Sequence, residues 1–293
     1  MPGQLPGEGA VFLDHVAHFV PAMEPAAVAL SACGFRLTPF SEQTNRVAGQ
    51  TVAAGTGNRC AMLRRGYLEI LVATGETPLA QQLRASLSRH IGLHLVAFST
   101  GDAAAEHRRL AAAGFPVLPL VDMRRPVATE SGQRDARFTI ARVAPGAMPE
   151  GRVQFLTHHS ESLVWRRDRL DHRNGAQALR ALWVAAADPH EPAQRFARFT
   201  GRPARREGEI ETIALDRGAL HFAPPEFLAR EFGLPLLPSL PGLAAYEIAV
   251  SDLQVAARLL TAAGLGLQPL EDGFAVVLPA ALGGAIVFRQ LSG

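Results

Sequence analysis

The sequence predicts an α+β protein made of four β-α-β-β-β units that form two tandem domains. Four helix-like segments each end in a glycine, each follows a short apolar strand, and each precedes two or three strand-like pieces. Glycine favours the left-handed conformation that closes many helices, and self-similarity of this kind indicates repeated structural units. The four closing glycines are Gly34, Gly114, Gly201 and Gly264.

Within each unit, the first strand is the apolar stretch before the helix, and turn or cap residues mark where the helix begins. The last strand starts at a glycine and continues with apolar residues. The first strands are HVAHFV (15–20), GLHLVAF (92–98), ALWVAAA (181–187) and AAYEIAV (244–250). The last strands are GYLEILV (66–72), GRVQFLT (151–157), GALHFAP (218–224) and GGAIVFR (283–289).

One charged segment, residues 158–177, interrupts the repeat between the second and third units and contains an Asn-Gly turn signal. We therefore expect a first domain over 1–165 that holds units one and two. A linker follows over 166–176. The second domain, over 177–293, holds units three and four.

The composition limits the function classes. Of the 293 residues 48% are hydrophobic, which is enough for a substantial core, and the formal net charge is only +2. All basic residues are arginine, and they are scattered in pairs rather than gathered in a stripe, which disfavours nucleic-acid binding. The N-terminus does not look like a signal peptide, and no apolar run is long enough to span a membrane. Two cysteines without a disulfide framework favour a cytoplasmic protein.

The repeat singles out a set of polar residues in the first half. His15 lies 19 residues before Gly34, and His94 lies 20 before Gly114. Glu69 and Gln154 occupy matching places on the last strands, third after the glycine. Two imidazoles and a carboxylate can bind one divalent metal ion and leave coordination positions open. Gln154 would complete the shell or bind the ligand; the alternative is a polar cleft without a metal.

The second half lacks this set, because the corresponding residues are Ala181, His221, Ala244 and Val287. We expect this domain to be metal-free and to serve as a structural or lid-forming copy. His18 lies three residues after His15 on the same strand, so it faces the opposite side, and we expect it to pack rather than to react.

Four further residues are candidates for binding the substrate. Asn58 and Arg59 lie in a glycine-containing turn that enters a strand, and Arg137 lies on an alternating strand whose register the sequence does not fix. An arginine there would suit a carboxylate or phosphate. His158 lies near the expected rim of the cleft, four residues after Gln154.

Four stretches carry a resemblance to a known family: LDHV (13–16), GYLEIL (66–71), GTGNRCAMLRRGYLEIL (55–71) and LVWRRDRLDHRNGA (163–176). They resemble the vicinal oxygen chelate superfamily, and more narrowly its glyoxalase-like branch, and the resemblance covers nearly the whole chain. This superfamily includes glyoxalase I, extradiol dioxygenases and bleomycin- and fosfomycin-resistance proteins. The resemblance implies that His15, Glu69 and His94 are metal ligands. Gln154 departs from the glutamate of many members, which counts against extradiol chemistry.

Three functions follow from the resemblance. The first is a glyoxalase-like isomerase or lyase. It would bind a small oxygenated substrate through one divalent ion (zinc, nickel, manganese or iron) and use Glu69 as the catalytic base. The second is a non-catalytic protein that binds or sequesters a small molecule, as bleomycin-resistance proteins do. The third is an extradiol-type dioxygenase. The expected partners are a small-molecule substrate and a second copy of the chain in a homodimer.

Overall fold

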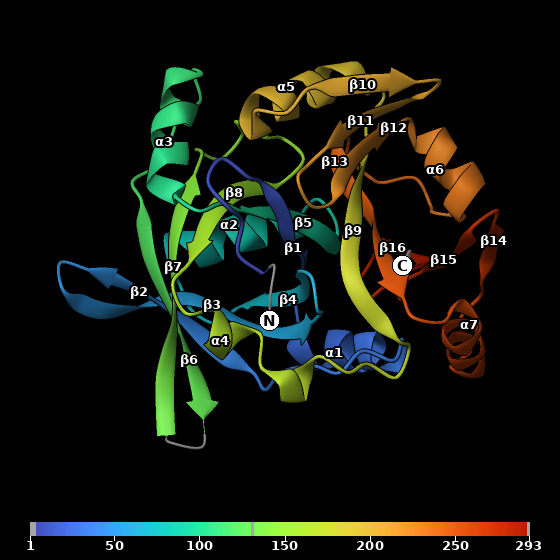
Figure 1. The fold of residues 1–293 in the computed structure, drawn as a ribbon, viewed down its shortest axis with the longest axis horizontal. Helices are drawn as coiled ribbons and strands as arrows, with labels where there is room; N and C mark the ends of the chain where they lie inside the picture. The colour runs from blue at the N-terminus through green and yellow to red at the C-terminus, as the bar shows by residue number, and fades with distance from the viewer. Residues whose placement is uncertain (1–3, 130–131, 292–293) are drawn as a thin grey trace.

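Two β-sheets of eight strands each form the framework of the structure, a computed structural model that describes residues 4–129 and 132–291 (Figure 1). The first sheet closes into a barrel in the order β1-β4-β3-β2-β6-β7-β8-β5. The second has the order β10-β11-β12-β9-β13-β16-β15-β14 and edge strands at both ends. The predicted α+β fold of four β-α-β-β-β units is confirmed.

The first two units supply the barrel. Unit one contains β1 (Phe12–Phe19), α1 (Met23–Ala32), β2 (Ser41–Val47), β3 (Gln50–Met62) and β4 (Tyr67–Ala73). Unit two contains β5 (Gly92–Ser99), α3 (Ala103–Ala112), β6 (Val121–Thr129), β7 (Gly132–Arg142) and β8 (Arg152–His158). A helix that the repeat did not predict, α2 (Pro78–Leu87), connects the two units.

The last two units supply the second sheet, after the short helices α4 (Glu161–Val164) and η1 (Arg167–Arg169). Unit three contains β9 (Ala176–Ala185), α5 (His190–Thr200), β10 (Ala204–Glu207), β11 (Ile210–Ala214) and β12 (Ala219–Ala223). After α6 (Pro225–Phe232), unit four contains β13 (Gly242–Val250), α7 (Leu253–Ala262), β14 (Gln268–Leu270), β15 (Gly273–Val277) and β16 (Ala285–Gln290).

Local chemistry explains where the unit helices begin and end. The carboxylates of Asp102 and Asp252 accept backbone N–H groups in the first turns of α3 and α7, as N-cap residues do. The four predicted closing glycines all have positive φ, between +68° and +86°. A residue with a β-carbon would be strained there.

The same strand pairing recurs in every unit and places the site. The first strand pairs in parallel with the last strand of its own unit, as β1 does with β4 and β5 with β8. The first strands of the two units in a sheet pair with each other in antiparallel orientation. In each unit of the barrel, the first and last strands, which are predicted to carry the polar residues, therefore lie next to each other in the barrel wall.

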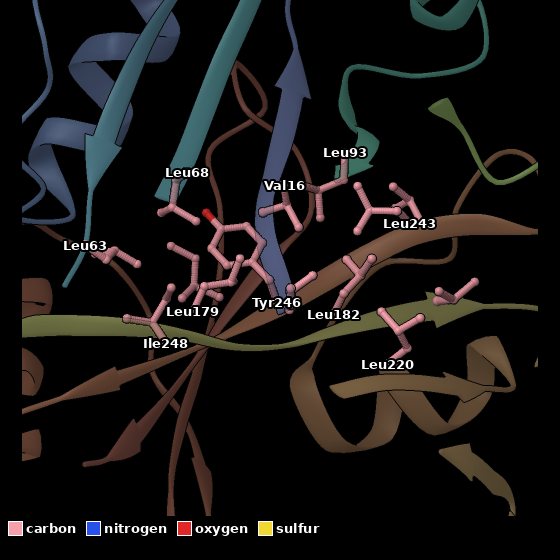
Figure 2. Packing of buried hydrophobic residues seen from close by; sticks show 14 of the residues in the cluster. Val16, Leu63, Leu68, Leu93, Leu179, Leu182, Leu220, Leu243, Tyr246 and Ile248 are labelled. Atoms are coloured by element: carbon pink, nitrogen blue, oxygen red, sulfur yellow. The ribbon is translucent and has the colours of Figure 1, made fainter. Parts of the chain in front are cut away.

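The two sheets share a hydrophobic core (Figure 2). His18 belongs to this contact, since its Nε2 lies 3.2 Å from the Tyr246 hydroxyl and its Nδ1 lies 3.0 Å from the Leu282 carbonyl oxygen. Burial lowers the pKa of His18 to about 4. The labelled side chains of Figure 2 include Val16, Leu68 and Leu93 from the barrel and Leu182, Leu243 and Tyr246 from the second sheet.

In the described part of the chain, no helix is long and apolar enough to cross a membrane.

Candidate functional site

A small cavity of about 40 Å³ lies inside the barrel. Alternate residues of a strand point to the same face, so Arg152, Gln154 and Leu156 of β8 all line it. Its polar lining consists of His15, Gln43, Asn58, Tyr67, Glu69, Arg125, Arg142, Arg152 and Gln154.

Glu69 is held in one orientation by two amides. Its Oε1 accepts a hydrogen bond from Asn58 Nδ2 at 2.5 Å and one from Gln43 Nε2 at 3.3 Å. Gln43 is itself positioned by the Thr56 hydroxyl, which donates to its Oε1 at 2.7 Å. The other carboxylate oxygen, Oε2, lies 3.7 Å from His15 Nε2. Glu69 thus presents one oxygen toward His15 while both amides hold the other.

His15 is oriented by a buried aspartate that the sequence analysis did not single out. Asp14 Oδ2 lies 2.8 Å from His15 Nδ1, and Asp14 Oδ1 lies 2.9 Å from His158 Nε2. Tyr67 stacks on the His15 ring with centroids 4.3 Å apart. With Nδ1 donating to Asp14, the ring atom of His15 that remains available to a ligand is Nε2.

Asp14 is fully buried. Burial alone would raise its pKa, but His158 and His15 hold the pKa of this carboxyl well below its usual range. A bulge in β1 makes this position possible, because the pairing with β5 runs from Leu13 to His15 and skips Asp14. A bulged residue leaves the regular alternation, so neighbouring residues 14 and 15 both reach the polar network.

Three arginines bring positive charge to the cavity. Arg142 donates from Nε to Gln154 Oε1 at 3.0 Å, and Arg152 donates from Nη2 to Gln82 Oε1 at 2.9 Å. Burial lowers the pKa of Arg142 to about 10 and that of Arg152 to about 9, the latter helped by the neighbouring charge of Arg142. Arg125 donates to Cys60 Sγ at 3.4 Å.

Of the residues expected at the site, the structure brings together His15, Asn58, Glu69 and Gln154 around the cavity. His158 lies behind them, where it binds Asp14 rather than lining the space.

Three expected residues lie elsewhere. Arg59 faces outward from β3 and donates to the Thr38 carbonyl, because its neighbour Asn58 takes the inward position. Arg137 is exposed, since Phe138, Ile140 and Arg142 form the inward face of β7.

His94 is the third, and its distance from the cavity follows from the strand register. Ala17 pairs with Glu69 and His15 with Tyr67, while Ala97 pairs with Gln154 and Leu95 with Arg152. The counterpart of His15 is therefore Leu95, which also lies 19 residues before its closing glycine. By the same register, the counterparts in the second sheet are Ala181, paired with Ala219, and Ala245, paired with Ala285.

His94 itself occupies a bulge, because the pairing of β1 with β5 passes from Leu95 to Leu93. Its Nε2 lies 2.8 Å from the His90 carbonyl oxygen, and its ring lies 4.1 Å from the His90 ring. Burial lowers the pKa of His94 to about 4. His94 therefore belongs to the packing at the start of β5 and does not share a cavity with His15.

Superfamily members commonly use a divalent metal ion, but the donors of this cavity do not fit one. Within residues 4–129 and 132–291, no group of three or more His, Cys, Asp or Glu side chains could hold a metal ion. His15 and Glu69 are the two such side chains in the described lining, and the Gln154 oxygen already accepts from Arg142. The three guanidinium groups that line the space further disfavour a cation.

A larger hollow of about 570 Å³ adjoins the cavity, and both are lined by Asn58 and Arg125. We call this hollow the vestibule. Arg166 and Arg169, from the segment predicted to link the domains, lie on its wall. Because the two hollows share Asn58 and Arg125, the vestibule lies next to the cavity that Glu69 lines.

Comparisons with known proteins agree with this architecture. A family model described as a glyoxalase-like domain matches residues 13–200. No curated protein matches the chain.

Several solved structures share the fold. A hypothetical protein from Staphylococcus aureus is 11% identical, with a TM-score of 0.66, over 96% of this chain and 100% of that one. A mutant 4-hydroxymandelate synthase from Streptomyces coelicolor is 15% identical, with a TM-score of 0.55, over 97% and 94%. A catechol 2,3-dioxygenase is 13% identical, with a TM-score of 0.56, over 96% and 92%. At these identities the likeness shows the fold alone.

Proposed function

Because the chain belongs to the glyoxalase-like family of the vicinal oxygen chelate superfamily, we propose that the barrel cavity is an active site that isomerises or cleaves a small oxygenated substrate by proton transfer. One observation carries this proposal. Glu69 Oε2 and His15 Nε2 face each other across 3.7 Å in a buried cavity, with Asp14 behind the histidine.

Each group has a distinct role in the proposed reaction. Glu69 takes a proton from the carbon next to a substrate carbonyl, since its second oxygen is already fixed by Asn58 and Gln43. The electrons of the broken C–H bond form a carbon–carbon double bond, the π electrons of the carbonyl group move to its oxygen, and His15 donates a proton from Nε2 to that oxygen. Asp14 accepts a hydrogen bond from His15 Nδ1 and so fixes which ring nitrogen faces the substrate.

The size of the site limits the substrate. A water molecule needs about 10–15 Å³ of such space, so a cavity of about 40 Å³ holds only a few heavy atoms. The reacting part of the substrate is therefore small, and any larger part extends into the vestibule.

The metal-dependent forms of this function, including the extradiol-type alternative, were predicted with a second imidazole at the position that matches His15 in unit two. Leu95 occupies that position. The proposed steps therefore use only the side chains of this chain. A reducing compartment suits both cysteines, which are free and buried.

Exchange of substrate C–H protons with D₂O tests the proposal. Pyruvate, hydroxypyruvate and hydroxyacetone, each with protons next to a carbonyl, are incubated with the protein and followed by proton NMR. We expect exchange with the wild type and a loss of about 100-fold or more in Glu69→Gln, while Arg59→Gln, altered on the outer face of β3, retains it. A compound that binds without any exchange would support the non-catalytic binding protein instead.

A further inference from the structure

We propose that the ligand of this cavity is an oxyanion, a carboxylate or phosphate, and that Arg142 and Arg152 bind its charge. The inference rests on the proposed function only in using the same cavity. It concerns which molecules bind, whereas the proposed function concerns what Glu69 does to them.

The lining of the cavity carries an excess of positive charge. Arg125, Arg142 and Arg152 line a cavity in which Glu69 is the one carboxylate of the described lining. Among residues 4–129 and 132–291, no Asp or Glu oxygen lies within 4.0 Å of any of these three guanidinium groups. Buried charges in proteins are normally paired, so an anion is the missing partner.

The guanidinium groups of Arg142 and Arg152 contact neutral partners. Arg142 and Arg152 each donate to a neutral amide oxygen, of Gln154 and Gln82 respectively. Arg152 Nε is buried without a hydrogen-bond partner in the described structure. Their pKa values of about 10 and about 9 keep both groups charged at neutral pH. The unsatisfied Nε of Arg152 matches an oxygen of a carboxylate or phosphate.

The two arginines lie on the opposite side of the barrel from the proposed base, Glu69. Arg142 and Arg152 come from β7 and β8, which are four and three strands away from β4 and Glu69 around the barrel. An oxyanion held on the β7–β8 wall directs the rest of the molecule toward Glu69. The carbon next to the charged group would then lie between the arginine pair and the carboxylate.

The vestibule beside the cavity is also lined by arginines, of which Arg166 and Arg169 pair with Asp168. Arg125, Arg166 and Arg169 line the vestibule, against Glu42 as the one carboxylate of its described lining. A cleft lined mainly by positive charge raises the local concentration of anions and their association rate.

Calorimetric titration of the full chain with pyruvate, hydroxyacetone and inorganic phosphate tests the inference. Hydroxyacetone replaces the carboxylate of pyruvate with a neutral group of similar size. We expect wild-type protein to bind pyruvate or phosphate at least about 10-fold more tightly than hydroxyacetone, and the stronger of the two anions identifies the charged group. Equal affinity for pyruvate and hydroxyacetone, or no binding of either anion, would overturn the inference.

Variants locate the effect. Arg142→Gln and Arg152→Gln should each weaken anion binding about 10-fold or more, whereas Arg137→Gln, altered on the exposed face of β7, should bind as the wild type does. If circular dichroism shows that either cavity variant is misfolded, a competition experiment on the wild-type protein replaces it. Phosphate and pyruvate should then compete for one site, and failure to compete would overturn the proposal. Glu69→Gln separates the two ideas, because it should lose proton exchange yet retain anion binding.

Discussion

Replacing Asp14 with asparagine tests the buried network that orients His15. Asp14 accepts hydrogen bonds from two histidines, at 2.8 and 2.9 Å, and is fully buried. Asparagine keeps the shape, but its amide can accept on one side only and must donate on the other. Each charge-assisted hydrogen bond contributes about 1.5–3 kcal/mol, so we expect Asp14→Asn to lower the free energy of unfolding by about 3 kcal/mol at pH 7.

The assay is urea denaturation followed by circular dichroism between pH 7 and pH 3. The pKa of Asp14 is lower in the folded than in the unfolded protein. Its stabilisation is therefore complete above about pH 4, the pKa range of unfolded aspartate, and is lost as the pH falls toward the folded value. The difference between wild type and variant should be constant from pH 7 to about 4 and shrink below that.

Asp171→Asn is the matched control, because Asp171 is exposed and pairs with Arg64 at the surface. It should change stability by less than about 0.5 kcal/mol. If Asp14→Asn were no more destabilising than this control, the account of Asp14 as the ionised anchor of His15 would be refuted.

Three other predictions follow from the register and from burial. Leu95→His should create affinity for cobalt(II), visible as a ligand-field absorption band, whereas the wild type shows none; an identical titration of both proteins would contradict the register. His94→Gln should leave proton exchange within about threefold of wild type, well short of the roughly 100-fold loss of a catalytic acid or base. His18 has a folded-state pKa of about 4, below the ordinary histidine value of 6.5, because it is buried. The unfolded chain therefore binds the extra proton as the pH falls from about 6.5 to 4, and wild type should lose stability there, by up to about 3 kcal/mol. His18→Gln should make the free energy of unfolding less dependent on pH in this range. An unchanged pH dependence would count against the assignment of this effect to His18.

Much of the fold could be predicted because its signals are local. Closing glycines and cap residues depend on the backbone conformation of a few neighbouring residues, and Gly34 and Asp102 behave as the sequence indicates. The matching last strands also placed Glu69 and Gln154 correctly on one inward face. These features repeat along the chain, so each unit supports the interpretation of the others.

The parts of the site that the sequence did not reveal depend on irregular strand pairing. Bulges at Asp14 and His94 shift the alternation by one residue, and no residue pattern marks them. They brought Asp14 into the network and removed His94 from it. The sequence did contain one sign that His94 is not the counterpart of His15. His15 lies 19 residues before its closing glycine, and the residue 19 before Gly114 is Leu95 rather than His94.

The arginines were missed for a different reason. Arg152 shares the inward face of β8 with Gln154, two residues away, so simple alternation could have found it. Arg142 follows in the same way once Phe138 rather than Arg137 is placed inward on β7. That choice depends on the register of the strand, which the sequence alone leaves open.

The most direct test compares Glu69→Gln with His94→Gln in the exchange of pyruvate methyl protons in D₂O. Both residues were matched to ligand positions by the family resemblance, but Glu69 lines the cavity and His94 does not. Our account predicts that Glu69→Gln abolishes exchange while still binding pyruvate, and that His94→Gln retains exchange. Loss of exchange in His94→Gln with wild-type rates in Glu69→Gln would contradict it.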